Sequence, residues 1–282
     1  MKCRALLLAS ALAAVLALRT EAAVVTADFN DLTAGALNGK AGGTGWTGTW
    51  SGSAIGAVAA GDLTSSLYAI TQSGTGEHIQ NGNTTGLRQN FRIPTTALTG
   101  EVWFSYLART TATTTGAGMS FNASTLTPFQ DPGNAFLQFV GTSLIYRFGQ
   151  ASDQTLTNQV TINSTALVVG QMILNGGGAA DTIKLWVNPN LIADPNIFDY
   201  TPVISSSALN FADSITTIGA IMHNNTGSST TITGQLDVIR LSDGGGNAAT
   251  AYLDVTGVPE PSAAALVGMG VALFGMARRR CR

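Results

Sequence analysis

Short runs of alternating apolar and polar residues, separated by turn-rich pieces, fill the chain from residue 24 to residue 256. Alternation of this kind predicts β-strands with one face in a core, because successive side chains of a strand point to opposite faces. Many short strands with polar turns predict two packed antiparallel sheets, so the expected fold class is an all-β sandwich. The expected strands are 25–29, 101–109, 135–140, 143–148, 166–174, 182–187, 215–222 and 235–241.

Residues 23–256 are interpreted as one domain, because neither an internal repeat nor a proline-rich linker divides them. Gly141-Thr142, between two expected strands, suits a two-residue hairpin. No helical pattern longer than two turns stands out, and 247–257 are expected to form a last strand and a short tether. The expected core residues are Trp103, Phe104, Tyr106, Phe139, Leu185 and Trp186.

The charge of this domain excludes one class of partner. It contains seven basic and 14 acidic side chains, a balance near −7. Phosphate backbones are bound by basic faces, so nucleic acid is not an expected partner. Both cysteines, Cys3 and Cys281, lie outside the domain, which therefore has no disulfide and no thiolate metal site.

Residues 1–22 have the three-part layout of a secretory signal peptide. A basic start with Lys2 and Arg4 precedes an apolar stretch from Ala5 to Leu18, and small residues surround Ala22. This apolar stretch of 14 residues is too short to span a bilayer comfortably. We expect the protein to be exported and cleaved after Ala22.

The C-terminal segment, residues 257–282, combines three parts. Pro259-Glu260-Pro261 keeps the chain extended, residues 262–277 are 16 uncharged and largely apolar residues, and arginines follow at 278, 279, 280 and 282. As a helix the apolar run is about 24 Å long, a marginal span for a hydrocarbon core of ~30 Å. The arginines are expected to stay cytoplasmic, which places Pro259-Glu260-Pro261 on the outer side of the membrane.

These residues resemble a known sorting signal. Val258-Pro259-Glu260-Pro261, the apolar run and Arg278-Arg279-Arg280 are similar to the PEP-CTERM signal of Gram-negative bacteria. The resemblance implies recognition by an exosortase, a membrane transpeptidase, with cleavage at the Pro-Glu-Pro sequence. It also implies a transient membrane anchor, a final place at the cell surface or outside the cell, and an association with exopolysaccharide and biofilm.

The domain carries a second, looser resemblance. Asp28-Phe29 and the segment GGTGWTGTWSG at 42–52 are similar to the opening of concanavalin A-like (LamG-like) jelly rolls of exported bacterial proteins. VWFSY at 102–106, DTIKLWVNP at 181–189 and LDVIR at 236–240 resemble later strands of that group. This resemblance implies a jelly roll of two curved sheets, often with carbohydrate-binding or adhesive roles.

No catalytic constellation is recognisable in the sequence. Sugar hydrolases use paired carboxylates, but Glu77 and Glu101 are the domain's only glutamates, and no Glu-x-Asp-x-x-Glu pattern occurs. His78 and His223 are isolated, without a His-Glu-x-x-His motif, and no Gly-x-Ser-x-Gly motif exists. Glu77-His78 is placed in a glycine-rich loop and interpreted as a surface pair. We therefore expect no enzymatic activity and assign no catalytic residue.

Trp46 and Trp50 are the candidate carbohydrate-binding residues, since aromatic rings can stack on sugars. Their even spacing also suits burial on one face of a strand, and this alternative is favoured. A calcium site among Asp194, Asp199 and Asp213 would suit the resembled group, but the Asp-x-Asp-x-Asp-Gly spacing of a calcium loop is absent. No metal ligand and no cofactor are assigned.

Two functions of different classes stay open. The first is an exported, non-enzymatic protein of the envelope or extracellular matrix, sorted through residues 257–282, associated with exopolysaccharide and able to bind carbohydrate. The alternative is a secreted polysaccharide-active enzyme, a glycoside hydrolase or lyase, on the same jelly-roll fold. Because no paired carboxylates mark a hydrolase site, we favour the first function.

Overall fold

The computed structural model of the 282-residue chain describes residues 22–52, 56–70, 76–81, 86–122, 135–149, 152–209, 213–224 and 233–258. Three sequence predictions lie outside these residues: the signal peptide up to Glu21, Pro259-Glu260-Pro261, and the closing arginines Arg278, Arg279, Arg280 and Arg282. In the described part of the chain, no helix combines the length and the apolar character needed to cross a membrane.

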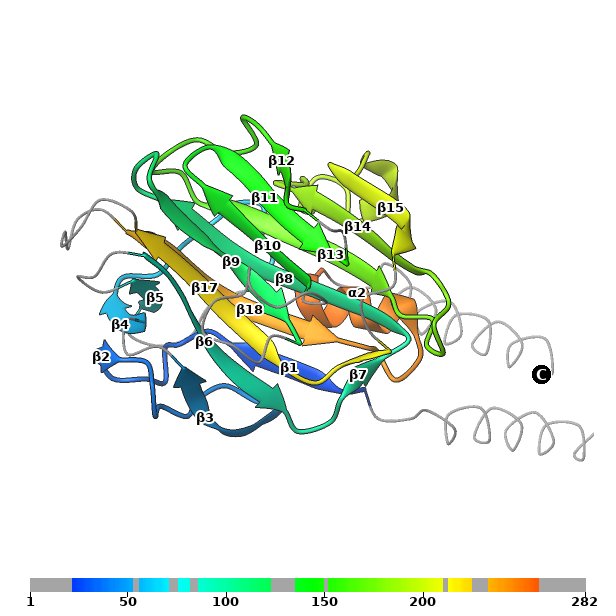
Figure 1. Ribbon diagram of the computed structural model, residues 1–282, viewed down its shortest axis with the longest axis horizontal. Helices are drawn as coiled ribbons and strands as arrows, with labels where there is room; N and C mark the ends of the chain where they lie inside the picture. The colour runs from blue at the N-terminus through cyan, green and yellow to red at the C-terminus, as the bar shows by residue number, and fades with distance from the viewer. Residues whose placement is uncertain are drawn as a thin grey trace, which may run out of the picture.

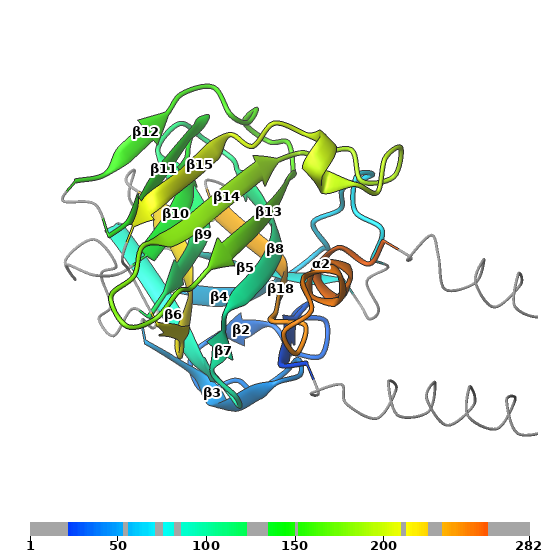
Figure 2. The same ribbon diagram turned by 90° about the vertical axis from the view of Figure 1, so that its right-hand side faces the viewer.

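Two antiparallel sheets lie face to face and form a β-sandwich, as the alternating pattern predicts (Figures 1 and 2). Among the described residues the first sheet has nine strands, in the order β15-β14-β13-β8-β18-β5-β4-β2, with β1 also paired to β18. The second has seven, in the order β12-β11-β10-β9-β17-β6-β3. Strands distant in sequence are neighbours in both sheets, which is the jelly-roll type of sandwich expected from the sequence.

The nine-stranded sheet comprises β1 (Val24–Ala27), β2 (Gly35–Ala36), β4 (Gly56–Ala60), β5 (Glu77–Asn81), β8 (Glu101–Thr110), β13 (Ala166–Ile173), β14 (Asp181–Val187), β15 (Ile204–Leu209) and β18 (Gly234–Ser242). The seven-stranded sheet comprises β3 (Trp46–Gly52), β6 (Gly86–Pro94), β9 (Thr115–Phe121), β10 (Ala135–Val140), β11 (Ser143–Phe148), β12 (Gln154–Leu156) and β17 (Ile218–Asn224). A separate pair is formed by β7 (Leu98–Thr99) and β16 (Ser214–Ile215). The described helices are α2 (Ala248–Thr256) and a 3-10 turn, η2 (Ile197–Asp199).

The strands expected from the sequence coincide with observed ones, with one division. The run expected at 215–222 is split, because Ile215 pairs with Leu98 in the separate pair and β17 begins at Ile218. The predicted hairpin joins β10 to β11, and Gly141 has the positive φ of 59° that such a turn favours.

The larger hydrophobic core lies between the two sheets, and we call it the inter-sheet core. Alternate side chains of β8, including Phe104 and Tyr106, point into it from the nine-stranded sheet. The facing sheet supplies others, including Met119 and Phe139. With Leu185 of β14, this cluster confirms four of the predicted core residues.

A second hydrophobic core lies on the outer face of the nine-stranded sheet, under α2, and we call it the α2 core (Figure 2). It contains Trp103 of β8, Trp186 of β14, and Tyr252 and Val255 of α2. The two tryptophans are buried, as predicted, and their rings stack at 5.8 Å. They face α2 rather than the other sheet, because they alternate with Phe104 and Leu185 along their strands.

Buried hydroxyl groups fix α2 to the sheet. The Tyr68 hydroxyl donates to the Val255 carbonyl oxygen at 2.9 Å, and the Ser105 hydroxyl donates to the same oxygen at 2.5 Å. Burial of Tyr68 raises its pKa to about 12. Because a buried polar group without a partner costs free energy, these bonds favour one position of the helix on the sheet.

A β-bulge in β18 allows that strand to serve both cores. Its pairing with β8 shifts register between Asp237 and Arg240, and Val238 has a φ of 49°. As a result, Leu236 and Ile239 both lie in the inter-sheet core although they are three positions apart along the chain, an odd spacing that would place them on opposite faces of a regular strand. The buried Asp237 carboxylate accepts the N–H of Val238 at 2.8 Å, which supports the bulge.

Two sequence predictions are wrong. Residues 248–256 form α2 rather than a strand: the Asn247 side chain accepts the Thr250 N–H at 3.2 Å, and Gly257 ends the helix with a φ of 67°. With nine residues, α2 is too short to give a clear helical period. Glu77 and His78 lie in β5 rather than in a loop, and His78 is buried.

The outermost strands of both sheets are short or irregular. Strand β2 has two residues and β12 has three. Strand β15 pairs with β14 through a register shift between Asp181 and Ile183, and β3 pairs with β6 through one between Thr47 and Ser51. Short strands and bulges interrupt the row of backbone donors and acceptors that an edge strand presents.

Candidate functional site

Trp46 and Trp50, the predicted sugar-binding candidates, pack together in β3 beside the inter-sheet core. Trp50 is 1% exposed, and its ring lies 5.9 Å from Phe29 and 5.4 Å from Trp46. Trp46 is half-buried, and its indole N–H donates to the Thr26 carbonyl oxygen at 2.7 Å. This packing agrees with the favoured interpretation as core residues, and Trp50 offers no ring face to a sugar.

Arg92 binds the glycine-rich segment that contains the two tryptophans. Its guanidinium lies over the Trp46 ring, 5.3 Å from the centroid. Its Nε and Nη2 donate to the Gly48 carbonyl oxygen at 3.0 and 2.6 Å, and Nη1 donates to Gly42. Burial lowers the pKa of Arg92. The segment at 42–50 is thus wrapped around a guanidinium group, which gives it a structural role.

The outer face of the seven-stranded sheet carries small and polar side chains together with the buried Phe136 and Ile221. Ala117 of β9 faces the inter-sheet core, so Gly118 and Ser120 face outward. The Ser120 hydroxyl donates to the Gln89 side-chain oxygen at 2.6 Å, and a Cβ on Gly118 would lie 2.4 Å from the Cα of Gln138. Ser120, Gln89 and Gln138 are buried. This polar layer is therefore not an open surface on which a sugar could stack.

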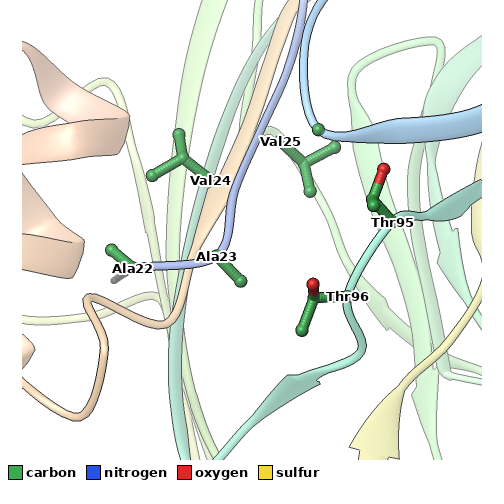
Figure 3. A pocket seen from close by; sticks show the side chains of 7 residues that line it. Ala22, Ala23, Val24, Val25, Thr95 and Thr96 are labelled. Carbon is green, nitrogen blue, oxygen red and sulfur yellow. The ribbon is translucent and has the colours of Figure 1, made fainter. Parts of the chain in front are cut away.

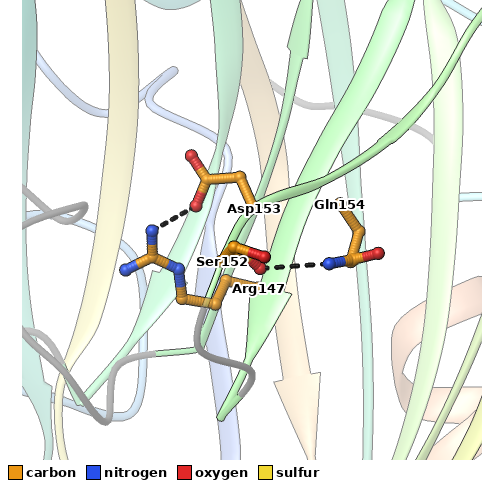
Figure 4. Close-up of polar contacts among 4 residues, drawn as sticks. All are labelled: Arg147, Ser152, Asp153 and Gln154. Carbon is orange, nitrogen blue, oxygen red and sulfur yellow. Dashed lines mark hydrogen bonds and ion pairs between the residues drawn. The ribbon is translucent and has the colours of Figure 1, made fainter.

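An ion pair lies on the β11–β12 side of this sheet. The Arg147 guanidinium pairs with the Asp153 carboxylate, and Gln154 Nε2 donates to the Ser152 carbonyl oxygen at 3.2 Å (Figure 4). Arg147 also lies over the Phe136 ring, 5.7 Å from its centroid. The carboxylate is partly exposed, so the pair contributes little to stability.

Two of the titratable residues singled out in the sequence, Glu101 and Asp194, accept hydrogen bonds that stabilise the fold. Glu101 accepts the Trp103 indole N–H at 2.9 Å and the Gln171 amide at 2.6 Å. The Asp194 carboxylate accepts the Asn196 N–H at 3.0 Å, within one turn of chain. Within the described residues, no three His, Cys, Asp or Glu side chains come together in a group that could hold a metal ion.

A cavity of about 160 Å³ lies beside the first described residues (Figure 3). Pockets that enclose small-molecule ligands usually have a volume of ~300–1,000 Å³, so this cavity is small for a sugar. No charged side chain lines it. The lining residues are Ala22, Ala23, Val24, Val25, Gly45, Thr95 and Thr96.

The start of β1 is tied to the turn that precedes α2. The Ala23 N–H donates to Asp243 Oδ1 at 3.0 Å, and the Gly245 N–H donates to the same oxygen at 3.0 Å. At the other end of the described chain, Val258 is buried in the α2 core. Both ends of the described chain therefore lie on the side of the sandwich that carries α2 (Figure 2).

Residues 188–200, which follow β14, form a loop beside α2, and we call it the α2 loop. The Tyr252 hydroxyl of α2 donates to the Pro195 carbonyl oxygen at 2.7 Å. The Trp186 indole N–H donates to the Tyr200 carbonyl oxygen at 2.8 Å. These two bonds hold the second half of the loop against the α2 core.

The α2 loop carries two large apolar side chains on its surface. Leu191 and Ile197 are buried in the α2 core, whereas Ile192 and Phe198 are 62% and 59% exposed. Phe198 lies edge-on to Trp103, with ring centroids 5.7 Å apart. Sequence reasoning missed this patch, because the sequence of the loop has no regular period that separates buried from exposed positions. The one signal in the sequence that could have indicated the patch is the presence of four large apolar residues among turn-forming residues.

No protein-family model and no curated protein matches this chain. Among solved structures, the binding domain of botulinum neurotoxin serotype D is similar at 8% identity and a TM-score of 0.38, over 66% of this chain and 42% of that one. A Bacillus licheniformis β-glucanase is similar at 7% identity and a TM-score of 0.39, over 75% and 98%. A sialidase is similar at 9% identity and a TM-score of 0.39, over 67% and 17%. The chain spans less than half the length of the toxin domains, and likenesses this distant carry no conclusion about function.

Proposed function

We propose that this chain is an exported, non-enzymatic protein of a Gram-negative cell envelope or extracellular matrix. Residues 1–22 direct export, residues 23–256 form the folded domain, and residues 257–282 form the sorting segment. The apolar run at 262–277 first holds the domain at the outer side of the inner membrane, with the arginines on the cytoplasmic side. An exosortase-type transpeptidase then cleaves at Pro259-Glu260-Pro261 and releases the domain to the cell surface or the surroundings.

The observation that carries this proposal is the position of the two described ends. Ala22 and Val258 both lie on the side of the sandwich on which α2 packs (Figure 2). A domain exported behind a signal peptide and then held by a C-terminal segment is attached from that side alone. The seven-stranded sheet, on the opposite side of the sandwich, points away from the membrane in this arrangement.

The contact between Ala23 and Asp243 supports cleavage after Ala22. Cleavage there converts the Ala23 amide nitrogen, 3.0 Å from Asp243 Oδ1, into an ammonium group. A hydrogen bond between charged groups is stronger than a neutral one. The mature chain thus gains an ion pair at the start of β1, without any movement of the backbone.

The association with exopolysaccharide is proposed from the sorting segment and not from a site in the described domain. Trp50 is buried and Trp46 lies under Arg92, so neither tryptophan is kept as a sugar-stacking residue. The aspartates considered for calcium are likewise assigned no metal.

The sorting proposal is tested by mass spectrometry of the protein from its native host. Wild-type extracellular protein is expected to begin at Ala23 and to lack Arg278-Arg279-Arg280. Replacing Pro259-Glu260-Pro261 by alanines is expected to trap a full-length, membrane-bound form, while Pro202→Ala, a proline change inside the domain, leaves processing intact. Extracellular molecules that still carry the arginines would show that the segment is a plain anchor or an inert helix.

A combined binding and cleavage assay distinguishes the proposed matrix protein from the alternative, a polysaccharide-active enzyme. The purified protein is incubated with a panel of polysaccharides, and retention and reducing ends are measured together. Retention without new reducing ends supports a matrix role. Release of reducing ends that is lost when a single carboxylate is replaced would establish an enzyme instead.

A further inference from the structure

We propose that the α2 loop contacts the surface of the lipid bilayer while the sorting segment is still attached. The contact is made by Ile192 and Phe198, and the partner is a phospholipid surface without net charge. This inference rests on the proposed function, because it requires the apolar run at 262–277 to lie in the membrane.

The length of the connecting chain places α2 close to the bilayer. Val258 is buried in the α2 core, and the apolar run begins at Ser262. The intervening Pro259-Glu260-Pro261 and the bonds that join it to both ends span at most about 14 Å when fully extended. If the run is inserted, the C-terminal end of α2 is therefore held within about 14 Å of the membrane–water boundary.

The α2 loop keeps a fixed position relative to that end of α2. The bond from Tyr252 to the Pro195 carbonyl oxygen joins the loop to the helix directly, at 2.7 Å. The Tyr200 hydroxyl donates to the Asn190 carbonyl oxygen at 2.8 Å, which closes the loop on itself. A short tether on α2 thus keeps the loop, which is bonded to the helix, near the membrane surface.

The exposed side chains of the loop suit the interface of a bilayer. Ile93, Ile192 and Phe198 are the large hydrophobic residues that the described residues leave exposed, and two of them lie in this loop. Apolar and aromatic side chains are stabilised at the level of the lipid headgroups.

The charge of the loop selects the kind of lipid. Asp194 and Asp199 are its charged residues, and the sequence from 188 to 200 contains no lysine or arginine. Anionic headgroups would repel the two carboxylates, since anionic membranes attract basic segments. A zwitterionic lipid such as phosphatidylcholine is therefore the expected partner.

The test uses the absence of cysteine from the domain. In the full chain, Cys3 and Cys281 are replaced by serine, and single cysteines are introduced as Ile192→Cys, Phe198→Cys and, as a control, Thr155→Cys. Thr155 is exposed on β12, which lies away from α2 in both views (Figures 1 and 2). Each variant carries an environment-sensitive fluorophore and is reconstituted with phosphatidylcholine vesicles.

We expect the probes at 192 and 198 to shift to shorter emission wavelengths and to be quenched by lipid-borne quenchers. The probe at 155 is expected to behave as in buffer, and vesicles containing phosphatidylglycerol are expected to weaken the shifts at 192 and 198. Flotation of the vesicles reports separately whether the chain is inserted. Floating protein whose probes at 192 and 198 match the control would overturn the inference and leave the sorting proposal standing. Protein that does not float would overturn both.

Discussion

The inter-sheet core and the α2 core share the strands β8, β13, β14 and β18 but are built in different ways. The inter-sheet core consists mainly of aliphatic, phenylalanine and methionine side chains that alternate along strands of both sheets, with Trp50 and Tyr106 among them. The α2 core joins strand residues to a helix and two loops, and it is rich in tryptophan and tyrosine. In the inter-sheet core the Tyr106 hydroxyl has no hydrogen-bond partner among the described residues, whereas the Tyr68 and Tyr252 hydroxyls of the α2 core are bonded.

The nine-stranded sheet is therefore stabilised differently on its two faces, by apolar burial on one face and by apolar burial together with hydrogen bonds on the other. Burial of apolar area is non-directional, and in the inter-sheet core it stabilises the pairing that places the apolar face of each strand inside. Hydrogen bonds from buried hydroxyls are directional, and they stabilise one position of α2 and its loop. The side of the domain that we place at the membrane is thus the side with the more specific packing.

The largest expected effect is the loss of stability when a buried apolar side chain is truncated, and we expect it to be larger in the inter-sheet core than in the α2 core. Phe104→Ala is expected to lower the free energy of unfolding by about 3–5 kcal/mol, because the ring is fully buried between the sheets and a cavity remains. Val255→Ala in the α2 core is expected to cost about 1.5–3 kcal/mol. Urea denaturation measures both, with the exposed Ile93→Ala as a control near zero. A Phe104→Ala variant as stable as the control would contradict this account of the inter-sheet core.

Alkaline pH is expected to weaken both cores through their tyrosines. Burial raises the pKa of Tyr68 and of Tyr252 to about 12, and that of Tyr106 well above its usual value. The folded state therefore holds the phenolic proton more tightly than the unfolded chain does. Each buried, protonated tyrosine therefore contributes stability that is fully present below pH ~10. This stability is lost as the pH rises toward 12, with a slope on the order of 1.4 kcal/mol per pH unit for each tyrosine.

Melting temperatures measured between pH 9 and pH 12 check this prediction. The double variant Tyr68→Phe/Tyr252→Phe is expected to flatten the alkaline decline, because two of the tyrosines with a raised pKa are gone. A decline of unchanged steepness would mean that other groups control alkaline unfolding.

A smaller effect compares two tyrosine hydroxyls directly. Tyr68→Phe is expected to cost about 1–2 kcal/mol, because the bond to the Val255 carbonyl oxygen is lost inside the protein. Tyr106→Phe is expected to be neutral or slightly stabilising, because its hydroxyl is buried without a partner among the described residues. Denaturation of both variants measures the difference. Equal losses would show that hydrogen bonding does not distinguish the two cores.

The smallest expected effect lies at the junction of the two cores, where β1 meets the turn before α2. In the mature chain, Asp243→Asn is expected to cost about 1 kcal/mol, since the charged bond to the Ala23 ammonium becomes weaker. This corresponds to a fall in Tm of about 2–4 °C for a domain of this size. Asp153→Asn, at the partly exposed pair with Arg147, serves as the control with less than 1 kcal/mol. Equal stability of the Asp243→Asn and wild-type proteins would argue against the ion pair.

The sandwich could be predicted from the sequence because its inter-sheet core follows the period of two. Phe104 and Tyr106, or Leu137 and Phe139, are spaced so that one face of a strand is apolar whatever the partner strand is. The α2 core could not be predicted in the same way. Burial of Trp103 was predicted from its residue type, but the sequence did not show that α2 and residues 61–70 cover it on the face of β8 opposite Phe104.

The candidate site was less predictable than the fold. Trp46 and Trp50 were singled out by residue type, but Arg92, which lies over Trp46, is more than 40 positions away in the sequence. The α2 loop gave no periodic signal, and its exposed pair, Ile192 and Phe198, is distinguished from Leu191 and Ile197 by one position in each case. Contacts between distant segments decide such details, and a single sequence does not contain them.

The irregular outer strands have a consequence for contacts between copies of this domain. Crowded sandwiches with long, straight edges can join edge to edge and aggregate, because each edge offers a ladder of free N–H and C=O groups. Here β2 and β12 have two and three residues, and β3 and β15 are interrupted by register shifts. In the described part of the chain, these four strands therefore offer only short or interrupted ladders, which disfavours edge-to-edge pairing between copies.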